Sequence, residues 1–207
     1  MSDTSDQPKR RVFIAAMNMR GSWAPRPSGC KLLNVTSMAR RDCPFRRDFS
    51  PMTMKPYRGF GCFEHYWQAG KKFEDVDFDK SVAWWKKQTR PRRRYPNSRG
   101  KRVLHARFPD HPPFDYIDSR KRVYVPEYHA MMTETESFAV FKRLVCTEGP
   151  PLVISDFDGP RTSDGSPVCL EATEALLREK INDGAFPFGH GYVVAAAVQG
   201  IDPEAYV

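Results

Sequence analysis

The chain has no apolar run that approaches the roughly 20 residues needed to cross a bilayer. Its N-terminus also lacks the basic start and apolar stretch of a signal peptide, so we expect a cytoplasmic protein with no membrane partner. Internal repeats and low-complexity segments are missing as well. A length of 207 residues then predicts one domain over residues 12–207. Residues 1–11 are polar and charged, and we expect them to form a disordered lead-in.

Cysteine is sparse and scattered. The five cysteines form no close pair and no Cys-x-x-Cys motif, which argues against a disulfide framework and against a zinc site. We therefore expect reduced thiols and no metal. The sequence also contains neither Gly-x-Gly-x-x-Gly nor Gly-Lys-Ser/Thr, so a Rossmann dinucleotide fold and a P-loop are not expected. No cofactor is required by any motif in the chain.

Acidic residues are missing from residues 86–107, a stretch with ten lysines and arginines that we call the basic loop. Residues 147–207 have the opposite balance, with three basic and ten acidic residues. Because a positive field concentrates phosphates, we expect nucleic acid, DNA more than RNA, or a phosphate-bearing nucleotide as the partner. The alternative is a solvated loop without a partner. The expected nucleic-acid contacts are Arg90, Arg92, Arg93, Arg94, Arg99 and Lys101.

The apolar pattern predicts a helix-rich α+β domain with a few short strands. Strands are expected at residues 11–17, 32–36, 102–108, 122–125 and 152–154. Helices are expected at about residues 61–73, 79–88, 133–146, 168–182 and 191–199. Asp79 and the Thr133-Glu134-Thr135-Glu136 capping box indicate two of the helix starts, and the last helix is expected to stop at Gly200.

The segment 61–73 has two distinct faces when it is read at helical spacing. Large rings form a stripe that would face the core, namely Phe63, Tyr66, Trp67 and Phe73. Glu64, Gln68 and Lys71 follow one another at i, i+4 and i+7 on a second face. A carboxylate, an amide and an ammonium beside large rings indicate the wall of a polar pocket. The alternative is an ordinary amphipathic helix with solvated charges.

The run from Glu64 to Lys71 resembles the Glu-His-x-x-Gln-Ala-x-Lys helix of NADAR-type domains, and Phe49-Ser50-Pro51 resembles the aromatic-x-Pro segment that precedes it. That family includes N-glycosidases of riboflavin-pathway intermediates and hydrolases of ADP-ribosylated bases. The resemblance covers roughly residues 45–160, and it implies a hydrolytic glutamate at Glu64. Where the family has Asp-x-x-Trp-Gly, this chain has Asp158-Gly159-Pro160.

Further candidate site residues come from other parts of the chain. Asp156 and Asp158 follow a predicted buried strand, where loops often present catalytic groups; two turn-forming residues are the alternative. His190 lies between glycines before the last helix and could contact a phosphate or donate a proton, the alternative being a packing or capping histidine. Arg46 and Arg47 precede the Glu64 helix and could line the same pocket.

These residues together predict an enzyme that hydrolyses an N-glycosidic bond. Glu64 would stabilise the sugar cation or activate water, and Asp158 or Asp156 would orient the ribose or share the role of base. The expected substrate-binding residues are Trp67 or Trp84 against the base, Arg46, Arg47 and Lys71 on phosphate, and also Gln68 and His190.

Two substrate classes fit this hypothesis. One is a base in nucleic acid, such as a modified base in a conflict between phage and bacterium, which the enzyme would have to flip into its pocket. The other is an ADP-ribosyl group or a small nucleotide. Transfer of the ribosyl group would use the same residues as hydrolysis. The rival from another class is a non-catalytic nucleic-acid-binding module in which the carboxylates are structural.

Overall fold

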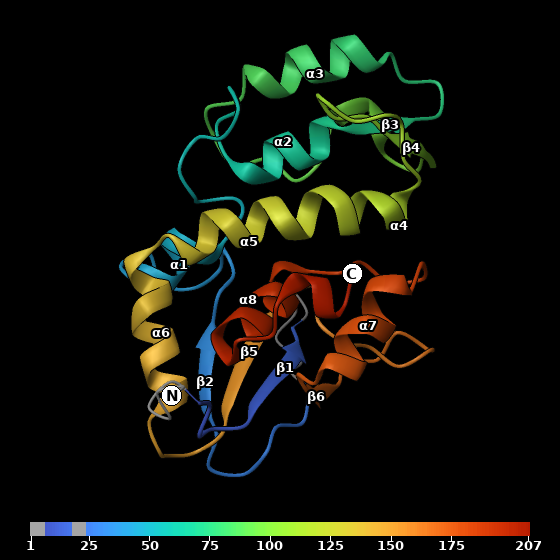
Figure 1. Cartoon of the computed structure of the whole chain (residues 1–207). Coiled ribbons are helices and arrows are strands. Elements are labelled where there is room, and N and C mark those ends of the chain that lie inside the picture. The colour runs from blue at the N-terminus through green and yellow to red at the C-terminus, as the bar shows by residue number, and fades with distance from the viewer. Residues whose placement is uncertain (1–6, 18–23) are drawn as a thin grey trace.

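A four-stranded sheet forms one side of the molecule (Figure 1). The structure, a computed structural model, describes residues 7–17 and 24–207. The strand order is β2-β5-β1-β6, in which β5 is parallel to both β1 and β2, and β6 is antiparallel to β1. The strands are β1 (Val12–Ala16), β2 (Lys31–Asn34), β5 (Leu152–Asp156) and β6 (Cys169–Glu171).

The two central strands are the apolar runs that the sequence predicts as strands. All residues of β1 and β5 are buried, because a parallel strand in the middle of a sheet is covered on both faces. One face packs against helix α8 (His190–Gln199), in which every residue up to Val198 is buried. This helix was predicted, and it ends as expected at Gly200, whose φ of 77° is the left-handed conformation that glycine adopts readily.

The remaining helices surround α8 and extend away from the sheet (Figure 1). A continuous helical run crosses the middle of the molecule; it consists of α4 (Tyr116–Ser119), a π-helical turn (Arg120–Tyr124) and α5 (Val125–Thr133). The others are α1 (Pro44–Phe49), α6 (Glu136–Cys146) and α7 (Glu174–Asn182), with 3-10 turns at Pro96–Ser98 and Pro203–Ala205.

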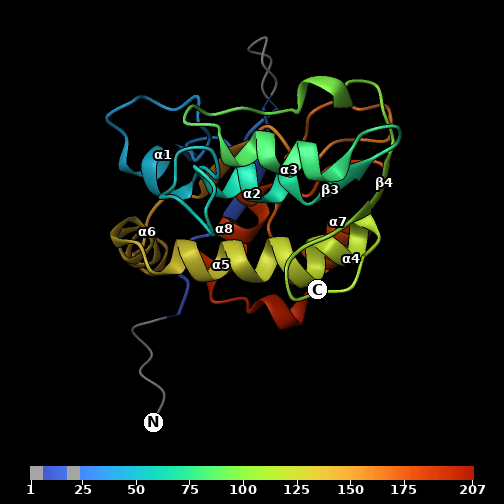
Figure 2. The ribbon, with the colours of Figure 1, turned by 90° about the horizontal axis from the view of Figure 1, so that it is seen from above.

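A second layer lies on the other side of this helical run. It contains α2 (Phe63–Ala69), α3 (Phe78–Lys86) and a two-stranded sheet of β3 (Lys71–Phe73) and β4 (Val103–Ala106). Seen from above, α2 and α3 run side by side (Figure 2). The whole is a helix-rich α+β domain with a few short strands, as predicted.

The strand predicted at residues 122–125 is wrong, because these residues are helical. Pro126 has no N–H, so the carbonyl of Arg122 lacks its usual partner four residues on. The N–H of Val125 bonds instead to the carbonyl of Arg120, five residues back, which is the π-helical pattern. Pro126 is therefore accommodated by one π-helical turn within a helix, and it does not mark the end of a strand.

Three predicted helix starts are also corrected. Asp77, and not Asp79, caps α3 by accepting the N–H of Lys80 at 3.0 Å. Thr133 belongs to α5, and Thr135 caps α6. The helix predicted from residue 168 begins only at Glu174, since residues 169–171 pair with the edge of β1 as strand β6.

The lead-in expected at residues 1–11 falls partly outside the described residues. Within the described part, the backbone N–H groups of Lys9 and Arg10 both bond to the carbonyl of Val145 at the end of α6. Residues 18–31, between the first two predicted strands, contain two glycines and two prolines and are expected to form a loop; part of this segment also lies outside the described residues. In the described ranges, no helix is long and apolar enough to span a bilayer. All five cysteines are free thiols.

Candidate functional site

A cavity of about 330 Å³ opens where the carboxyl ends of β2 and β5 meet the N-terminus of α8. The ends of parallel strands are a common place for ligand sites, because loops diverge there. The wall opposite the sheet comes from α2, and the helical run α4–α5 closes one side. The residues predicted from distant parts of the sequence therefore share one cavity; among them are Glu64, Trp67, Gln68, Lys71, Asp156, Asp158 and His190.

The polar face of α2 lines this cavity. Gln68 donates from Nε2 to Oε1 of Glu64 at 2.8 Å, which fixes the orientation of the carboxylate. The backbone N–H of Glu64 bonds to the carbonyl of Pro51, so the segment that precedes the helix also holds its first turn. Both side chains are half-buried. The prediction that this helix presents a polar wall is confirmed.

Lys71 reaches the same cavity from a different element than expected. α2 ends at Ala69, so Lys71 and Phe73 belong to β3 and not to the helix. A side chain at Gly70 would meet the ring of Phe108 at 2.3 Å, so only glycine lets the chain turn there. The ammonium of Lys71 lies 5.1 Å from the ring centroid of Trp67 and 5.3 Å from that of Tyr116.

Asp156 fastens the N-terminus of α8 to the end of β5. The residue is only 1 % exposed, and its Oδ2 accepts the N–H of Gly191 at 2.7 Å. The same oxygen lies 3.2 Å from Nδ1 of His190, whose Nε2 lies 3.1 Å from the carbonyl of Val35. A carbonyl only accepts, so Nε2 must carry a proton. Nδ1 then bonds to Asp156 through a second ring proton or through the proton of the carboxyl.

The geometry therefore gives Asp156 and His190 a positioning role at the wall of the cavity. Gly189 and Gly191 make this close approach possible: a Cβ at Gly189 would lie 2.3 Å from Oδ2 of Asp156, and one at Gly191 would lie 2.7 Å from its Cβ. The alternative that His190 is a packing residue agrees with these contacts, although the ring also borders the cavity.

Asp158 is the carboxyl group that faces the open cavity. Although the residue as a whole is exposed, it lines the pocket, and the surrounding protein groups act on its carboxyl. Burial raises the pKa of Asp158 to about 6, and the negative charges of Asp156 and Glu64 add to this effect, while His190 and Lys71 oppose it. A carboxyl with such a pKa can both hold and release a proton near neutral pH.

Two arginines of the basic loop form part of the same wall. Arg93 and Arg94 line the cavity, and the guanidinium of Arg93 lies 4.9 Å from the ring centroid of Phe157, next to Asp158. The backbone N–H of Arg92 bonds to Nε2 of the buried His65 on α2 at 3.1 Å. The basic loop is thus attached to α2, and it brings cations to the carboxylates.

Several predicted site residues lie elsewhere. Arg46 donates from Nε to the carbonyl of Ser37, and Arg47 pairs with Asp48 at 2.6 Å, so neither lines the cavity. Trp84 also stays outside, since it packs on Trp85 and Tyr95. Of the remaining basic-loop residues, Arg90, Arg92 and Arg99 are exposed, and Lys101 donates to the carbonyl of Asp75.

Sequence reasoning missed two tyrosines. Tyr116 and Tyr124 line the cavity from the helical run, and Tyr124 lies 4.9 Å from Trp67, measured between ring centroids. Burial raises the pKa of Tyr124 well above its ordinary value. The strand predicted at residues 122–125 concealed this tyrosine, because these residues are helical and lie in the run that closes one side of the cavity.

A buried arginine holds this side of the site in place. Arg120, in the π-helical turn, stacks on Tyr116 with 4.4 Å between guanidinium and ring centroid. It donates to the carbonyls of Asp183 and Phe186, both at 2.8 Å. The turn therefore connects the helical run to the segment that leads into α8.

No family model matches the chain, and no similar curated protein or solved structure was found. The resemblance to NADAR-type domains therefore stays a prediction. Among the described residues, no three His, Cys, Asp or Glu side chains come together as metal ligands.

We expect Gly191→Ala to destabilise the protein. Alanine normally favours a helix over glycine, but here its Cβ would clash with Asp156, which costs about 1–3 kcal/mol. For a protein of this size, each kcal/mol lowers the melting temperature by about 2–4 °C. Gly184→Ala is the matched control, since nothing lies within 4 Å of a Cβ at that position. Equal melting temperatures for the two variants would contradict the close approach.

We also expect Asp158→Asn to stabilise the protein in a pH-dependent way. Because the pKa of Asp158 is raised from 3.8 to about 6, its favourable contribution is complete below pH 3.8 and is lost as the pH rises through about 6. The variant should therefore exceed wild type at pH 7.5 by about 1 kcal/mol, allowing for screening by water in the pocket. The advantage should vanish towards pH 4. Chemical denaturation at several pH values measures it, and a constant difference would count against the raised pKa.

Proposed function

We propose that this chain hydrolyses the N-glycosidic bond of a phosphate-bearing nucleotide. The observation that supports this most strongly is the presence of Glu64 and Asp158 in one cavity, where the pKa of Asp158 is raised to about 6 and where Lys71, Arg93 and Arg94 also lie. Two carboxyl groups in different environments can divide the roles of acid and base between them. The resemblance of the Glu64 helix to NADAR-type domains points to the same chemistry.

Cleavage of such a bond builds positive charge on the sugar and negative charge on the leaving base. The carboxylate of Glu64, oriented by Gln68, would stabilise the sugar cation and take a proton from water. The water oxygen forms a bond to the anomeric carbon as the bond to the base nitrogen breaks. Asp158 would supply the proton that the leaving nitrogen takes up. Afterwards Glu64 releases its proton to solvent and Asp158 regains one from solvent, which restores both groups.

The rest of the cavity supplies binding groups for each part of a nucleotide. Lys71, Arg93 and Arg94 would bind phosphate, and Trp67 with Tyr116 would contact the ring of the base. A volume of about 330 Å³ suits a ligand of the size of one nucleotide. A nucleotide within a nucleic acid would enter as a flipped base, and DNA is our first candidate. The free thiols fit the cytoplasm.

Two other functions have specific observations in their favour. A free ADP-ribosyl or nucleotide substrate is favoured by the position of Arg93 and Arg94, which line the cavity itself. A non-catalytic binding module is favoured by Asp156, whose carboxylate is already bonded to Gly191 and His190. A measurement of turnover distinguishes the binding module from either enzyme. A comparison of DNA with free nucleotides as substrates distinguishes the two enzymes from each other.

We expect Glu64→Gln to abolish base release while substrate binding persists. Glutamine keeps the shape of the side chain but cannot stabilise the sugar cation, so kcat should fall by at least about 100-fold. Mass spectrometry of free bases measures this with modified and unmodified DNA, NAD and nucleoside monophosphates. Glu127→Gln is the control, since Glu127 accepts from Tyr57 and Tyr66 outside the cavity. Full activity of Glu64→Gln would remove Glu64 from the mechanism.

The pH profile of kcat/KM should also show the titration of the Asp158 carboxyl. If its protonated form donates to the leaving base, kcat/KM should be level just below about pH 6 and should fall about tenfold per pH unit above it. In Asp158→Asn, activity should be low and this alkaline fall should be absent. An unchanged alkaline limb in the variant would assign the proton to another group.

A further inference from the structure

A second cavity, of about 290 Å³, lies on the other side of α2 and takes no part in the site described above. α2 separates the two, since Glu64 and Gln68 face the first cavity, and Tyr66 and Ala69 face the second. Its interior is mainly aromatic, with the rings of Phe60, Tyr66, Phe78 and Phe108. Three cations stand around these rings, namely Arg58, Lys86 and Arg107.

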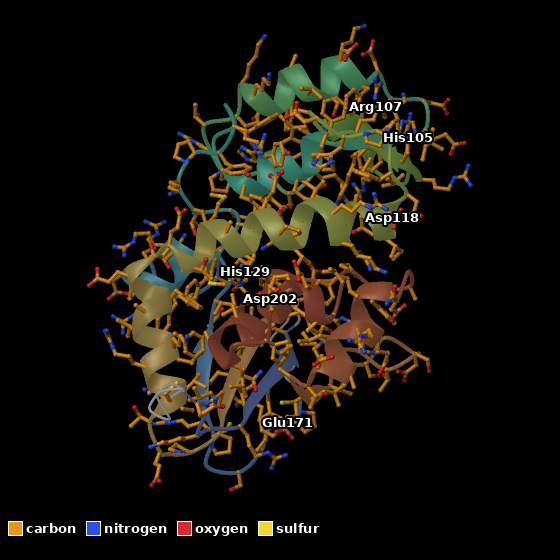
Figure 3. The ribbon with its side chains drawn as sticks, in the orientation of Figure 1. His105, Arg107, Asp118, His129, Glu171 and Asp202 are labelled. Atoms are coloured by element: carbon orange, nitrogen blue, oxygen red, sulfur yellow. The ribbon has the colours of Figure 1, made fainter. Side chains whose placement is uncertain are left out.

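The cations lie against ring faces. The ammonium of Lys86 is 5.7 Å from the ring centroid of Phe60, and the guanidinium of Arg107 is 4.9 Å from that of Phe78. Arg107 follows β4 and lies between that strand and α3 (Figure 3). Arg58 is 3.5 Å from Glu127. Within residues 7–17 and 24–207, no acidic residue lines this cavity, and no carboxylate pairs with Lys86 or Arg107.

Rings and cations in one cavity select a ligand that has both a flat surface and negative charge. A base stacks on aromatic side chains, and a phosphate pairs with lysine or arginine. An apolar ligand would leave Lys86 and Arg107 without a counter-charge, and an acidic peptide would leave the rings without a flat group to stack on them. The chemistry of the cavity therefore fits a nucleotide.

The basic loop connects this cavity to the candidate site. Lys86 borders the second cavity, and Arg93 and Arg94 border the first. The exposed Lys87, Arg90 and Arg92 lie between them in the chain. Because eight residues span at most about 28 Å, the two cavities are within reach of one short strand.

From this arrangement we infer that the second cavity binds a nucleotide that flanks the target in single-stranded DNA. The inference rests on the proposed function, because the target nucleotide occupies the Glu64 cavity. Phosphates between the two nucleotides follow the basic loop, and the flanking base enters the aromatic cavity. The cavity thus selects a polynucleotide over a free nucleotide.

The test measures binding of a fluorescein-labelled 12-nucleotide single strand of DNA by anisotropy, in a Glu64→Gln background that prevents turnover. Adding Lys86→Ala and Arg107→Ala should weaken binding at least about tenfold. It should also reduce the slope of log K against log salt by about 1.4, for two lost phosphate contacts on a single strand. Arg143→Ala is the matched control, an exposed cation on α6 whose loss should change affinity less than twofold.

A second variant tests entry of the base without altering charge. Val82 lines the second cavity, and Val82→Trp should fill it and weaken binding at least about fivefold. Melting temperatures verify that each variant is folded. If the strand does not bind, if the double variant binds like the control, or if Val82→Trp has no effect, the inference is overturned. Base release by wild type is measured separately, so strand binding through this cavity without any base release would overturn the proposed function alone.

Discussion

The site depends on the bond between Asp156 and the first turn of α8. The carboxylate is buried at the end of β5, and it is stabilised there by the N–H of Gly191 and by the ring of His190. A buried carboxylate without such partners would cost several kcal/mol. Glycine at positions 189 and 191 lets the helix approach closely enough to supply them. This contact brings together the strand end, the helix start and the loop that presents Asp158.

The wall of the cavity opposite this contact is formed by α2 and the basic loop. The bond from Gln68 orients Glu64, and the bond from the N–H of Arg92 to His65 attaches the loop to the same helix. Burial lowers the pKa of His65, and its Nε2 must be unprotonated to accept this bond. One helix thus places a carboxylate in the first cavity, anchors the loop whose cations lie beside it, and contributes the ring of Tyr66 to the second cavity.

Much of this arrangement could be predicted from local patterns. The strands expected at residues 11–17 and 152–154 and the buried last helix were predicted from apolar runs, and the polar face around Glu64 was predicted from helical spacing. Two of the failures have tertiary causes: β6 forms because the edge of β1 is open, and Lys71 reaches the pocket from a strand. Arg46, Arg47 and Trp84 were predicted from residue type and nearness in sequence. Neither property determines whether a side chain points into the cavity.

The most direct test of the central claim is hydrolysis in water enriched in oxygen-18. We expect wild type to release a free base and one labelled oxygen to appear on the anomeric carbon of the sugar product, detected by mass spectrometry. Base release without label in the sugar would show transfer to another acceptor and contradict hydrolysis. No base release from DNA, RNA, NAD or free nucleotides would contradict the account as a whole.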